Sequence, residues 1–212
     1  PLPSIWRFSG YILLSMSANS VTPFRLGDAY RGYLLSEDTK RVFAYSIGTI
    51  LAERVLDVLT VFLLLAVTAL LLSLRAMSAT SLWVLVIAFA LSAAMVALLL
   101  AMTLFQRRLL RFLPSRLADA YERFYQGTIG SFRMSVWRWI LLLVVSLAIW
   151  LAEIGRLFFV AHALGLPLSI PLVIFTSLAS AILFLVPGLP GGLGIVEPGL
   201  TGVLMLALSK EQ

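Results

Sequence analysis

The chain has 212 residues, of which 61% are hydrophobic and 12% charged, and its mean hydropathy is +1.02. These values exclude an ordinary soluble domain and indicate an integral membrane protein. The formal net charge of +6 would suggest nucleic acid as the partner of a soluble protein, but most arginines here lie in short segments between apolar runs, so we expect lipid headgroups and no nucleic acid.

The apolar runs predict an all-α, polytopic transmembrane fold. Residues 5–21 form a shorter, more polar run that we interpret as half of a span. Residues 106–135 are basic and amphipathic, and we expect them to lie along a membrane surface. Residues 168–186 form a further apolar run. The runs long enough for the ~20 residues that a spanning helix needs are 44–74, 81–105 and 136–165.

The ends of the chain suggest a piece of a larger membrane protein. The chain begins at Pro1 without a charged and then apolar leader, and it stops at Gln212 soon after an apolar run of about half a span. We therefore expect residues 1–212 to be a single transmembrane domain, a fragment that lacks helices at both ends.

The arginine bias of the connections predicts the orientation. Residues 106–135 contain six arginines and two acids, whereas residues 75–80 contain only Arg75. The segment 106–135 is therefore expected on the cytoplasmic side. Counting back through two spans places a second basic group on the same side, and its own charge agrees. That group is Arg25, Arg31, Lys40 and Arg41.

Charged residues also occur inside the run 44–74. Glu53 and Asp57 are four residues apart and share a helix face, and Arg54 is three residues from Asp57 and able to pair with it. The alternative is that Glu53 and Arg54 sit at the membrane interface with their charges in water. The spacing of these residues is equally consistent with a polar path inside the membrane and with a position at the membrane interface.

Glu153 and Arg156 lie deeper in their run. Placing either at an interface leaves too few apolar residues on one side to cross the bilayer. A charge at that depth costs ~3 kcal/mol on insertion scales, so a mutual i, i+3 pair or a polar cavity must offset the cost. A structural salt bridge between helices is the alternative to a functional role.

The stretch PGLPGGLGIVEPG, residues 187–199, interrupts what would otherwise be continuous apolar helix. Prolines remove backbone donors and glycines permit irregular dihedrals, so two half-helices, 168–186 and 195–208, are expected around a polar point. Glu197 would lie in the first turn of the second half-helix, where the dipole favours a carboxylate. Broken helices of this kind mark substrate sites in transporters. The structural alternative is an ordinary loop between two spans. A dinucleotide-binding motif is disfavoured because GGLGIVE lacks the third glycine of that motif. The expected break residues are Pro187, Pro190, Gly191, Gly192 and Gly194.

A second break is predicted in NSVTPFRLGDAYRGYLL, at Pro23 and Gly27. Its Pro23, Leu26, Gly27 and Asp28 echo Pro190, Leu193, Gly194 and Glu197. Three predicted spans separate the copies, and an odd number of spans makes them oppositely oriented. The echo therefore predicts inverted repeats, against the alternative of chance similarity between two proline and glycine loops.

Three separated motifs carry a family resemblance: PFRLGDAYRGYLL, AERVLDVL and LVPGLPGGLGIVE, in this order. Together they resemble the lysylphosphatidylglycerol synthase transmembrane-region family of flippase-like membrane proteins, which includes the membrane part of multiple peptide resistance factor. Family members commonly carry glutamate at the position of Asp28. The resemblance implies a bacterial or archaeal cytoplasmic-membrane protein of lipid translocation or envelope-lipid metabolism. No aminoacyl-transferase domain is present in these residues, so the synthase chemistry is not carried over.

We therefore expect the protein to bind an anionic or amino-acylated phospholipid and move it between leaflets. Arginines suit bidentate contact with phosphate, and carboxylates suit a cationic headgroup. One rival is a membrane-embedded lipid transferase that uses Asp28 or Glu53 as base or metal ligand, and another is a structural membrane subunit. The chain has no cysteine and a single histidine, and no clustered metal-ligand motif, so no metal, cofactor or catalytic residue is assigned. The expected headgroup-binding residues are Arg25, Asp28, Arg31, Glu53, Arg54, Asp57, Glu153, Arg156 and Glu197.

Overall fold

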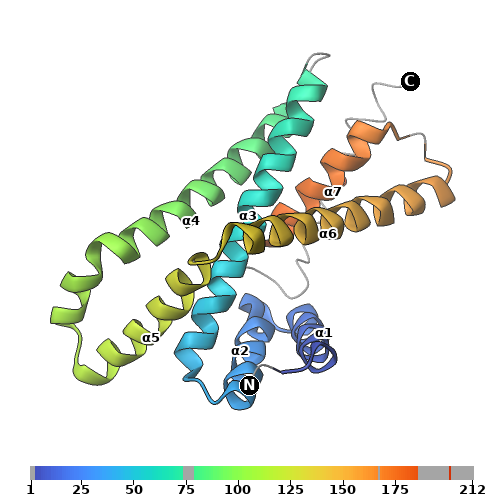
Figure 1. The fold of residues 1–212 in the computed structure, drawn as a ribbon. Coiled ribbons are helices and arrows are strands. Elements are labelled where there is room, and N and C mark those ends of the chain that lie inside the picture. Colours follow the sequence, from blue (N-terminus) through green and yellow to red (C-terminus); the bar gives the residue numbers. More distant parts are fainter. Residues whose placement is uncertain (1–2, 74–78, 167, 186–200, 202–212) are drawn as a thin grey trace. The chain divides into compact units, whose positions relative to one another are not determined.

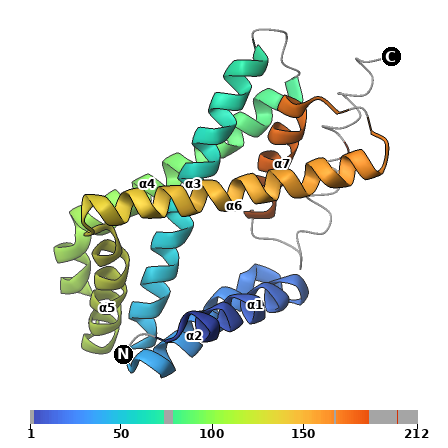
Figure 2. The ribbon, with the colours of Figure 1, turned by 45° about the vertical axis from the view of Figure 1, so that its right-hand side comes forward.

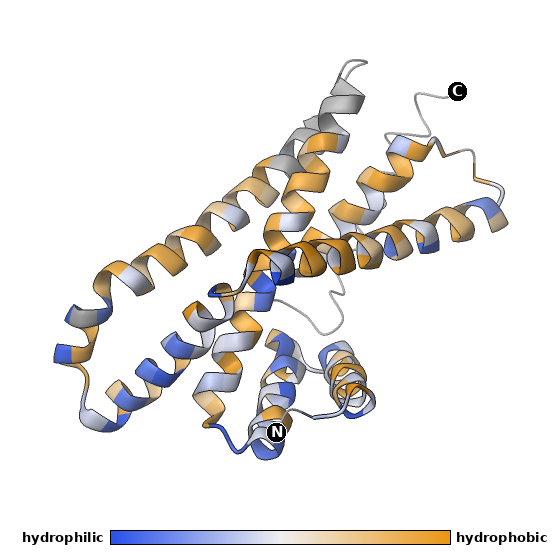
Figure 3. Cartoon of the chain, in the orientation of Figure 1, coloured by the Kyte–Doolittle hydropathy of each residue, from blue (hydrophilic) through white to orange (hydrophobic). Residues whose placement is uncertain are grey.

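The computed structural model describes residues 3–73, 79–166 and 168–185, with Thr201 beyond them, and within these ranges every regular element is a helix (Figure 1). The expected all-α fold is confirmed. In the part of the chain that the structure describes, two apolar stretches, Val86–Gln106 and Val136–Ala163, are long and apolar enough to cross a membrane, and Figure 3 shows their hydrophobic colouring. The elements are α1 (Ile5–Val21), the short 3₁₀ helix η1 (Pro23–Arg25), α2 (Leu26–Thr39), α3 (Phe43–Ser73), α4 (Ala79–Phe112), α5 (Ser115–Phe132), α6 (Val136–Ala163) and α7 (Ile170–Leu185).

Most predicted runs correspond to single helices, but one boundary differs. The run 81–105 was expected to end before a separate basic surface segment, whereas α4 continues through the first arginines to Phe112. Arginine is a good helix former, and no proline or glycine interrupts the chain before Pro114. Pro114 lies immediately before α5, where its fixed φ and missing N–H suit a helix start. The basic segment is therefore divided between the end of α4 and the whole of α5.

The predicted break at residues 187–199 and the half-helix 195–208 lie outside the described residues, except for Thr201. The half-helix arrangement around Glu197 and the inverted repeats stay predictions for this reason.

The chain divides into two compact units. Among the described residues, the first unit contains 3–56 and 93–134, and the second contains 57–73, 79–92, 135–166 and 168–185. Each unit has its own packing, and the candidate site lies within the first.

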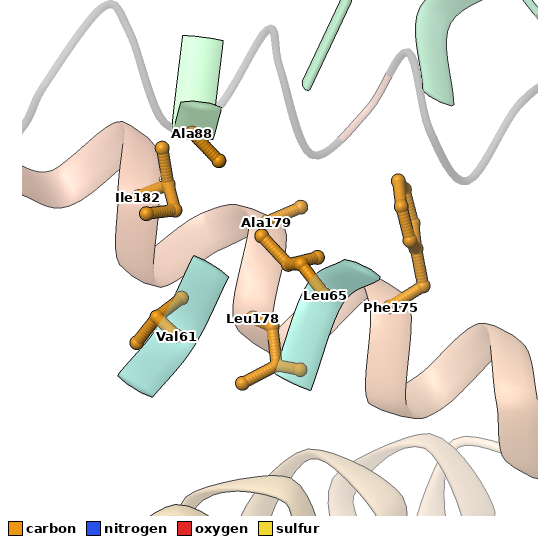
Figure 4. Close-up of a cluster of buried hydrophobic side chains, with 7 residues drawn as sticks. All are labelled: Val61, Leu65, Ala88, Phe175, Leu178, Ala179 and Ile182. Atoms are coloured by element: carbon orange, nitrogen blue, oxygen red, sulfur yellow. The ribbon is translucent and has the colours of Figure 1, made fainter. Parts of the chain in front are cut away.

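The second unit is built around α7. One buried cluster joins Val61 and Leu65 of α3 and Ala88 of α4 to one face of α7 (Figure 4). The α7 residues of this cluster follow the i, i+3, i+4, i+7 spacing of a single helix face. Since lipid tails are as apolar as these side chains, close packing rather than exclusion of water stabilises the contact in a bilayer. The α7 members are Phe175, Leu178, Ala179 and Ile182.

The first unit contains the α1–α2 hairpin, the start of α3, the end of α4, and α5. Figures 1 and 2 both show α5 beside the start of α3. Two glycines allow this approach, one from each helix. A Cβ on Gly48 would lie 2.2 Å from the carbonyl oxygen of Phe124, and a Cβ on Gly127 would lie 2.2 Å from that of Tyr45. Any larger residue at either position would force the two helices apart.

Candidate functional site

A tight turn between α1 and α2 positions the candidate site. The chain leaves α1 at Thr22, and Phe24 and Arg25 then both adopt the left-handed conformation with φ 56°. This conformation is uncommon for residues other than glycine. The turn begins at Pro23, the first residue of η1. It directs α2 back along α1, so that the two helices lie side by side in Figures 1 and 2.

Gly27 does not supply the irregular backbone that was expected of it. It lies inside α2 with an ordinary negative φ, and its lack of a side chain serves close packing instead. A Cβ there would lie 2.1 Å from the backbone oxygen of Ser15. The Gly27 N–H donates to Asn19 Oδ1 at 2.9 Å, which ties the first turn of α2 to the last turn of α1.

Asp28 is the centre of the site and accepts hydrogen bonds from four side chains. Ser15 Oγ and Asn19 Nδ2 donate to Asp28 Oδ1, at 3.1 Å and 3.2 Å. Arg25 Nε donates to Asp28 Oδ2 at 3.3 Å. Arg54, on α3, donates through Nε and Nη2 to both carboxylate oxygens at 3.2 Å. One carboxylate thus joins α1, α2 and α3, and its position in the first turn of α2 matches the helix dipole.

These contacts set the pKa of Asp28. The residue lies in α2, which at 14 residues is too short to cross a bilayer. Burial raises the pKa of Asp28, but the charges of Arg54 and Arg25 and the hydrogen bonds from Asn19 and Arg54 together outweigh it, and the pKa falls below 3.8. Asp28 is therefore ionised at neutral pH.

A second ion pair lies beside Asp28. Arg31 donates from Nη1 to Glu53 Oε1 at 3.1 Å and from Nη2 to Glu53 Oε2 at 2.9 Å, a bidentate geometry. The Arg31 residue is only 3% exposed, and its Nε is buried with no hydrogen-bond partner. Arg54 Nη2 lies 3.7 Å from Glu53 Oε1, so the two pairs form one network.

We call these five residues the arginine cluster: Arg25, Asp28, Arg31, Glu53 and Arg54. Three guanidinium groups and two carboxylates leave the cluster one excess positive charge. The sequence analysis placed all five among the expected headgroup-binding residues, and the structure brings them together.

The other predicted site residues belong to the second unit or fall outside the described residues. Asp57 follows Glu53 by one turn of α3 and belongs to the second unit. Glu153 and Arg156 also belong to the second unit, where they form the expected i, i+3 ion pair on α6, with Arg156 Nε donating to Glu153 Oε2 at 3.1 Å. Glu197 lies outside the described residues. Whether these four residues share a function with the arginine cluster stays a prediction.

Sequence reasoning missed Ser15 and Asn19. Both are buried on α1, at 3% and 8% exposure, and they bond Asp28. The available signal was their spacing of four residues, which puts two polar side chains on one face of the helix. A second contact at the open end of the same hairpin was also missed: Arg7 Nη1 lies 3.4 Å from Asp38 Oδ1, and the Tyr11 hydroxyl donates to Asp38.

The cluster contains none of the side-chain groupings that hold a metal ion. Within residues 3–73, 79–166 and 168–185, no three His, Cys, Asp or Glu side chains come close enough together to do so. The cluster pairs guanidinium groups with carboxylates, the planar acceptors that suit arginine.

Comparison with known proteins agrees with the membrane fold. The family model described as "Lysylphosphatidylglycerol synthase TM region" matches residues 3–212. A UPF0104 membrane protein of Methanocaldococcus jannaschii is 28% identical over 196 residues, which cover 90% of this chain and 80% of that protein. No solved structure matches the chain.

Proposed function

The chain belongs to the lysylphosphatidylglycerol synthase transmembrane-region family, and on that premise we propose that it binds an anionic or amino-acylated phospholipid by its headgroup and moves the lipid between leaflets. We place it in a bacterial or archaeal cytoplasmic membrane, with residues 106–135 on the cytoplasmic side.

The convergence of Arg25 and Arg54 on one carboxylate carries the proposal. Their side chains remain 25% and 24% exposed, so neither arginine is fully enclosed by the protein. A lipid phosphodiester has two non-bridging oxygens that can accept a bidentate contact from a guanidinium group, as the two oxygens of a carboxylate do. A headgroup phosphate can therefore take the place of Asp28 as the partner of one arginine without leaving that arginine unpaired.

The carboxylates of the cluster suit the other half of a headgroup. The Glu53 side chain is 42% exposed, although its partner Arg31 is buried. An amine on the headgroup can approach Glu53 from the exposed side while the bidentate contact with Arg31 persists. Arginines for a phosphate and a partly exposed carboxylate for an amine suit an amino-acylated headgroup better than free phosphate.

The geometry of Asp28 disfavours this residue as the general base of a transferase. A general base needs a pKa near the operating pH, whereas two arginines hold the pKa of Asp28 below 3.8. A carboxylate that accepts from four side chains is also committed to structure. Asp28 is better suited to holding arginines in place than to removing a proton.

Reconstitution into vesicles tests the proposal. Phosphatidylglycerol with a fluorescent headgroup label is placed in both leaflets, and an impermeant reductant then quenches the outer population. The protein is expected to make the inner population accessible, and Arg25→Ala is expected to slow this at least tenfold in protein that is still folded at the assay temperature. Arg116→Ala, an exposed arginine of α5 outside the cluster, is the control and keeps the parent rate.

Two results would reject translocation. One is a parent protein that leaves the inner population protected. The other is a new lipid species in the mass spectrum after incubation with a donor substrate, which would identify a transferase. Equal rates of lipid movement for the parent and Arg25→Ala would mean that the arginine cluster has a structural role and takes no part in lipid movement.

A further inference from the structure

A groove in the first unit lies apart from the arginine cluster. It has a volume of about 610 Å³, within the range of ligand-binding pockets. One wall is a single stripe of α4, and the opposite wall comes from Leu51 of α3 and from Tyr121 and Phe124 of α5. Nothing in the proposed function uses it. The α4 stripe contains Leu98, Ala101, Met102, Phe105, Leu109 and Phe112.

The groove is apolar along its length and carries one charge. Arg108 lines it, and the guanidinium carbon of Arg108 lies 6.0 Å from the centre of the Phe105 ring. The Tyr121 hydroxyl donates to the backbone oxygen of Met102 at 3.4 Å and is thereby satisfied within the wall. A ligand of this groove therefore needs a long apolar part and one negative group.

The position of Arg108 relative to the membrane span fixes the kind of ligand. The apolar stretch of α4 ends at Gln106, and Arg108 follows two residues later. Residues 98–105 then lie at the depth of lipid tails, and Arg108 lies at the level of headgroups. From Leu98 to Phe105 the helix rises about 11 Å, which fits within the roughly 15 Å of hydrocarbon in one leaflet.

The surrounding charge points the same way. Residues 106–135 contain six arginines and two acidic residues, so the headgroup end of the groove lies in a positive field. Basic residues next to a membrane span attract anionic lipids. An apolar groove at tail depth is not filled by water, because water there would lack polar partners.

We propose that this groove binds one acyl chain of an anionic glycerophospholipid from the bilayer, with the lipid phosphate at Arg108. The bound lipid completes the packing of α4 against α3 and α5, and this role is independent of any movement of lipid between leaflets.

Cysteine protection tests the acyl-chain part. The chain has no cysteine, so Ala101→Cys introduces a unique thiol in the groove wall. Leu104→Cys is the matched control, because Leu104 lies on the same helix, is 74% exposed and does not line the groove. The full chain in mild detergent is labelled with N-ethylmaleimide while dioleoyl phosphatidylglycerol is added. We expect at least tenfold slower labelling of Ala101→Cys and an unchanged rate at Leu104→Cys.

The phosphate part is tested by changing the net charge of the lipid, by removing the charge of Arg108, and by using a phosphate compound without acyl chains. Phosphatidylcholine with the same chains should protect about fivefold less well, as expected for one juxtamembrane basic side chain worth about 1 kcal/mol. Adding Arg108→Gln should abolish this difference, whereas adding Arg116→Gln should preserve it. Glycerol phosphate, which has no acyl chain, should not protect the thiol.

The inference is wrong if phosphatidylglycerol slows the labelling of Ala101→Cys and of Leu104→Cys equally. It is also wrong if phosphatidylglycerol protects the Ala101→Cys thiol equally well in the Arg116→Gln and Arg108→Gln backgrounds. Protection by glycerol phosphate would show a free-phosphate site instead. Because the readout is thiol labelling, its outcome does not depend on whether the protein translocates lipid.

Discussion

Arg31 and Glu53 form a bidentate ion pair whose two members differ tenfold in exposure. The Arg31 side chain is 4% exposed and the Glu53 side chain is 42% exposed. The buried positive charge thus belongs to α2, and the group that compensates for it belongs to α3 and reaches the edge of the site. The pairing makes α2 depend on α3 for its stability.

Glu53→Gln is the first test of this dependence. The substitution leaves the buried charge of Arg31 without its ionic partner, which should destabilise the protein by about 3 kcal/mol. The double variant with leucine at both positions removes the buried charge as well and should recover most of the loss. Unfolding in a detergent titration measures both, with the exposed Glu37→Gln as control. If Glu53→Gln leaves the stability of the protein unchanged, the buried Arg31 does not require Glu53 as its ionic partner.

Asp28 should give the stability of the protein a characteristic pH dependence. Its pKa in the folded protein is below 3.8, so the stabilisation from its ionised form is present above about pH 4 and is lost as the pH falls through the folded-state pKa. Asp28→Asn should therefore lower the melting temperature by several degrees at pH 7, and the gap to the parent should close in acid. A gap that is constant from pH 7 to pH 3 would contradict this.

The glycine contact between α3 and α5 predicts opposite effects for two neighbouring substitutions. Gly127→Ala places a methyl group 2.2 Å from the Tyr45 carbonyl oxygen and should destabilise the protein by about 2 kcal/mol. Gly130→Ala lies on the same helix, where an added Cβ meets nothing within 4 Å, and should be neutral or stabilising by roughly 0.5 kcal/mol. Thermal unfolding distinguishes the two, and similar losses for both would mean that α5 does not pack against α3 in this way.

The ion pair on α6 predicts that one substitution is worse than two. Arg156→Leu leaves Glu153 as a lone carboxylate within an apolar span, at a cost on the order of 3 kcal/mol or with uptake of a proton. Leucine at both positions should restore stability but reduce the rate of lipid movement. If the double variant moves lipid as fast as the parent, the pair is purely structural.

Orientation in the membrane can be measured with single cysteines. Ser115 lies at the start of α5, and Ser78 lies in the connection between α3 and α4. The arginine asymmetry predicts that Ser115→Cys reacts with an impermeant thiol reagent only from the cytoplasmic side, and Ser78→Cys only from the opposite side. Reaction of both from one side would overturn the predicted orientation.

Hydropathy predicted the long helices well, because a run of twenty apolar residues has few alternatives in a membrane. The partners of the charged residues were much harder to predict. Local spacing suggested Asp57 as the partner of Arg54, and the structure adds Asp28, 26 residues away along the chain. Arg31 and Glu53 are 22 residues apart. Contacts between helices depend on the direction in which the connecting turn leads the second helix. The spacing of residues along one helix does not contain that information.

Gly27 shows the same limit at a single residue. A glycine at this position correctly predicted that the backbone there is special. The reason, however, is close contact with α1 and not an irregular dihedral angle. The left-handed positions fall on Phe24 and Arg25, two residue types that give no such signal.

Under the proposed function, the left-handed Phe24 and Arg25 would couple the shape of the α1–α2 turn to the binding of a headgroup. Each left-handed non-glycine residue costs on the order of 1 kcal/mol or more, so the turn persists only while contacts elsewhere hold it. One of those contacts is Arg25 with Asp28, the same contact that a bound phosphate would compete for. A ligand that takes Arg25 away from Asp28 also removes a restraint on the turn. Under the proposed function, a phosphate bound at Arg25 would therefore loosen the α1–α2 turn and allow α1 to change its angle to α2.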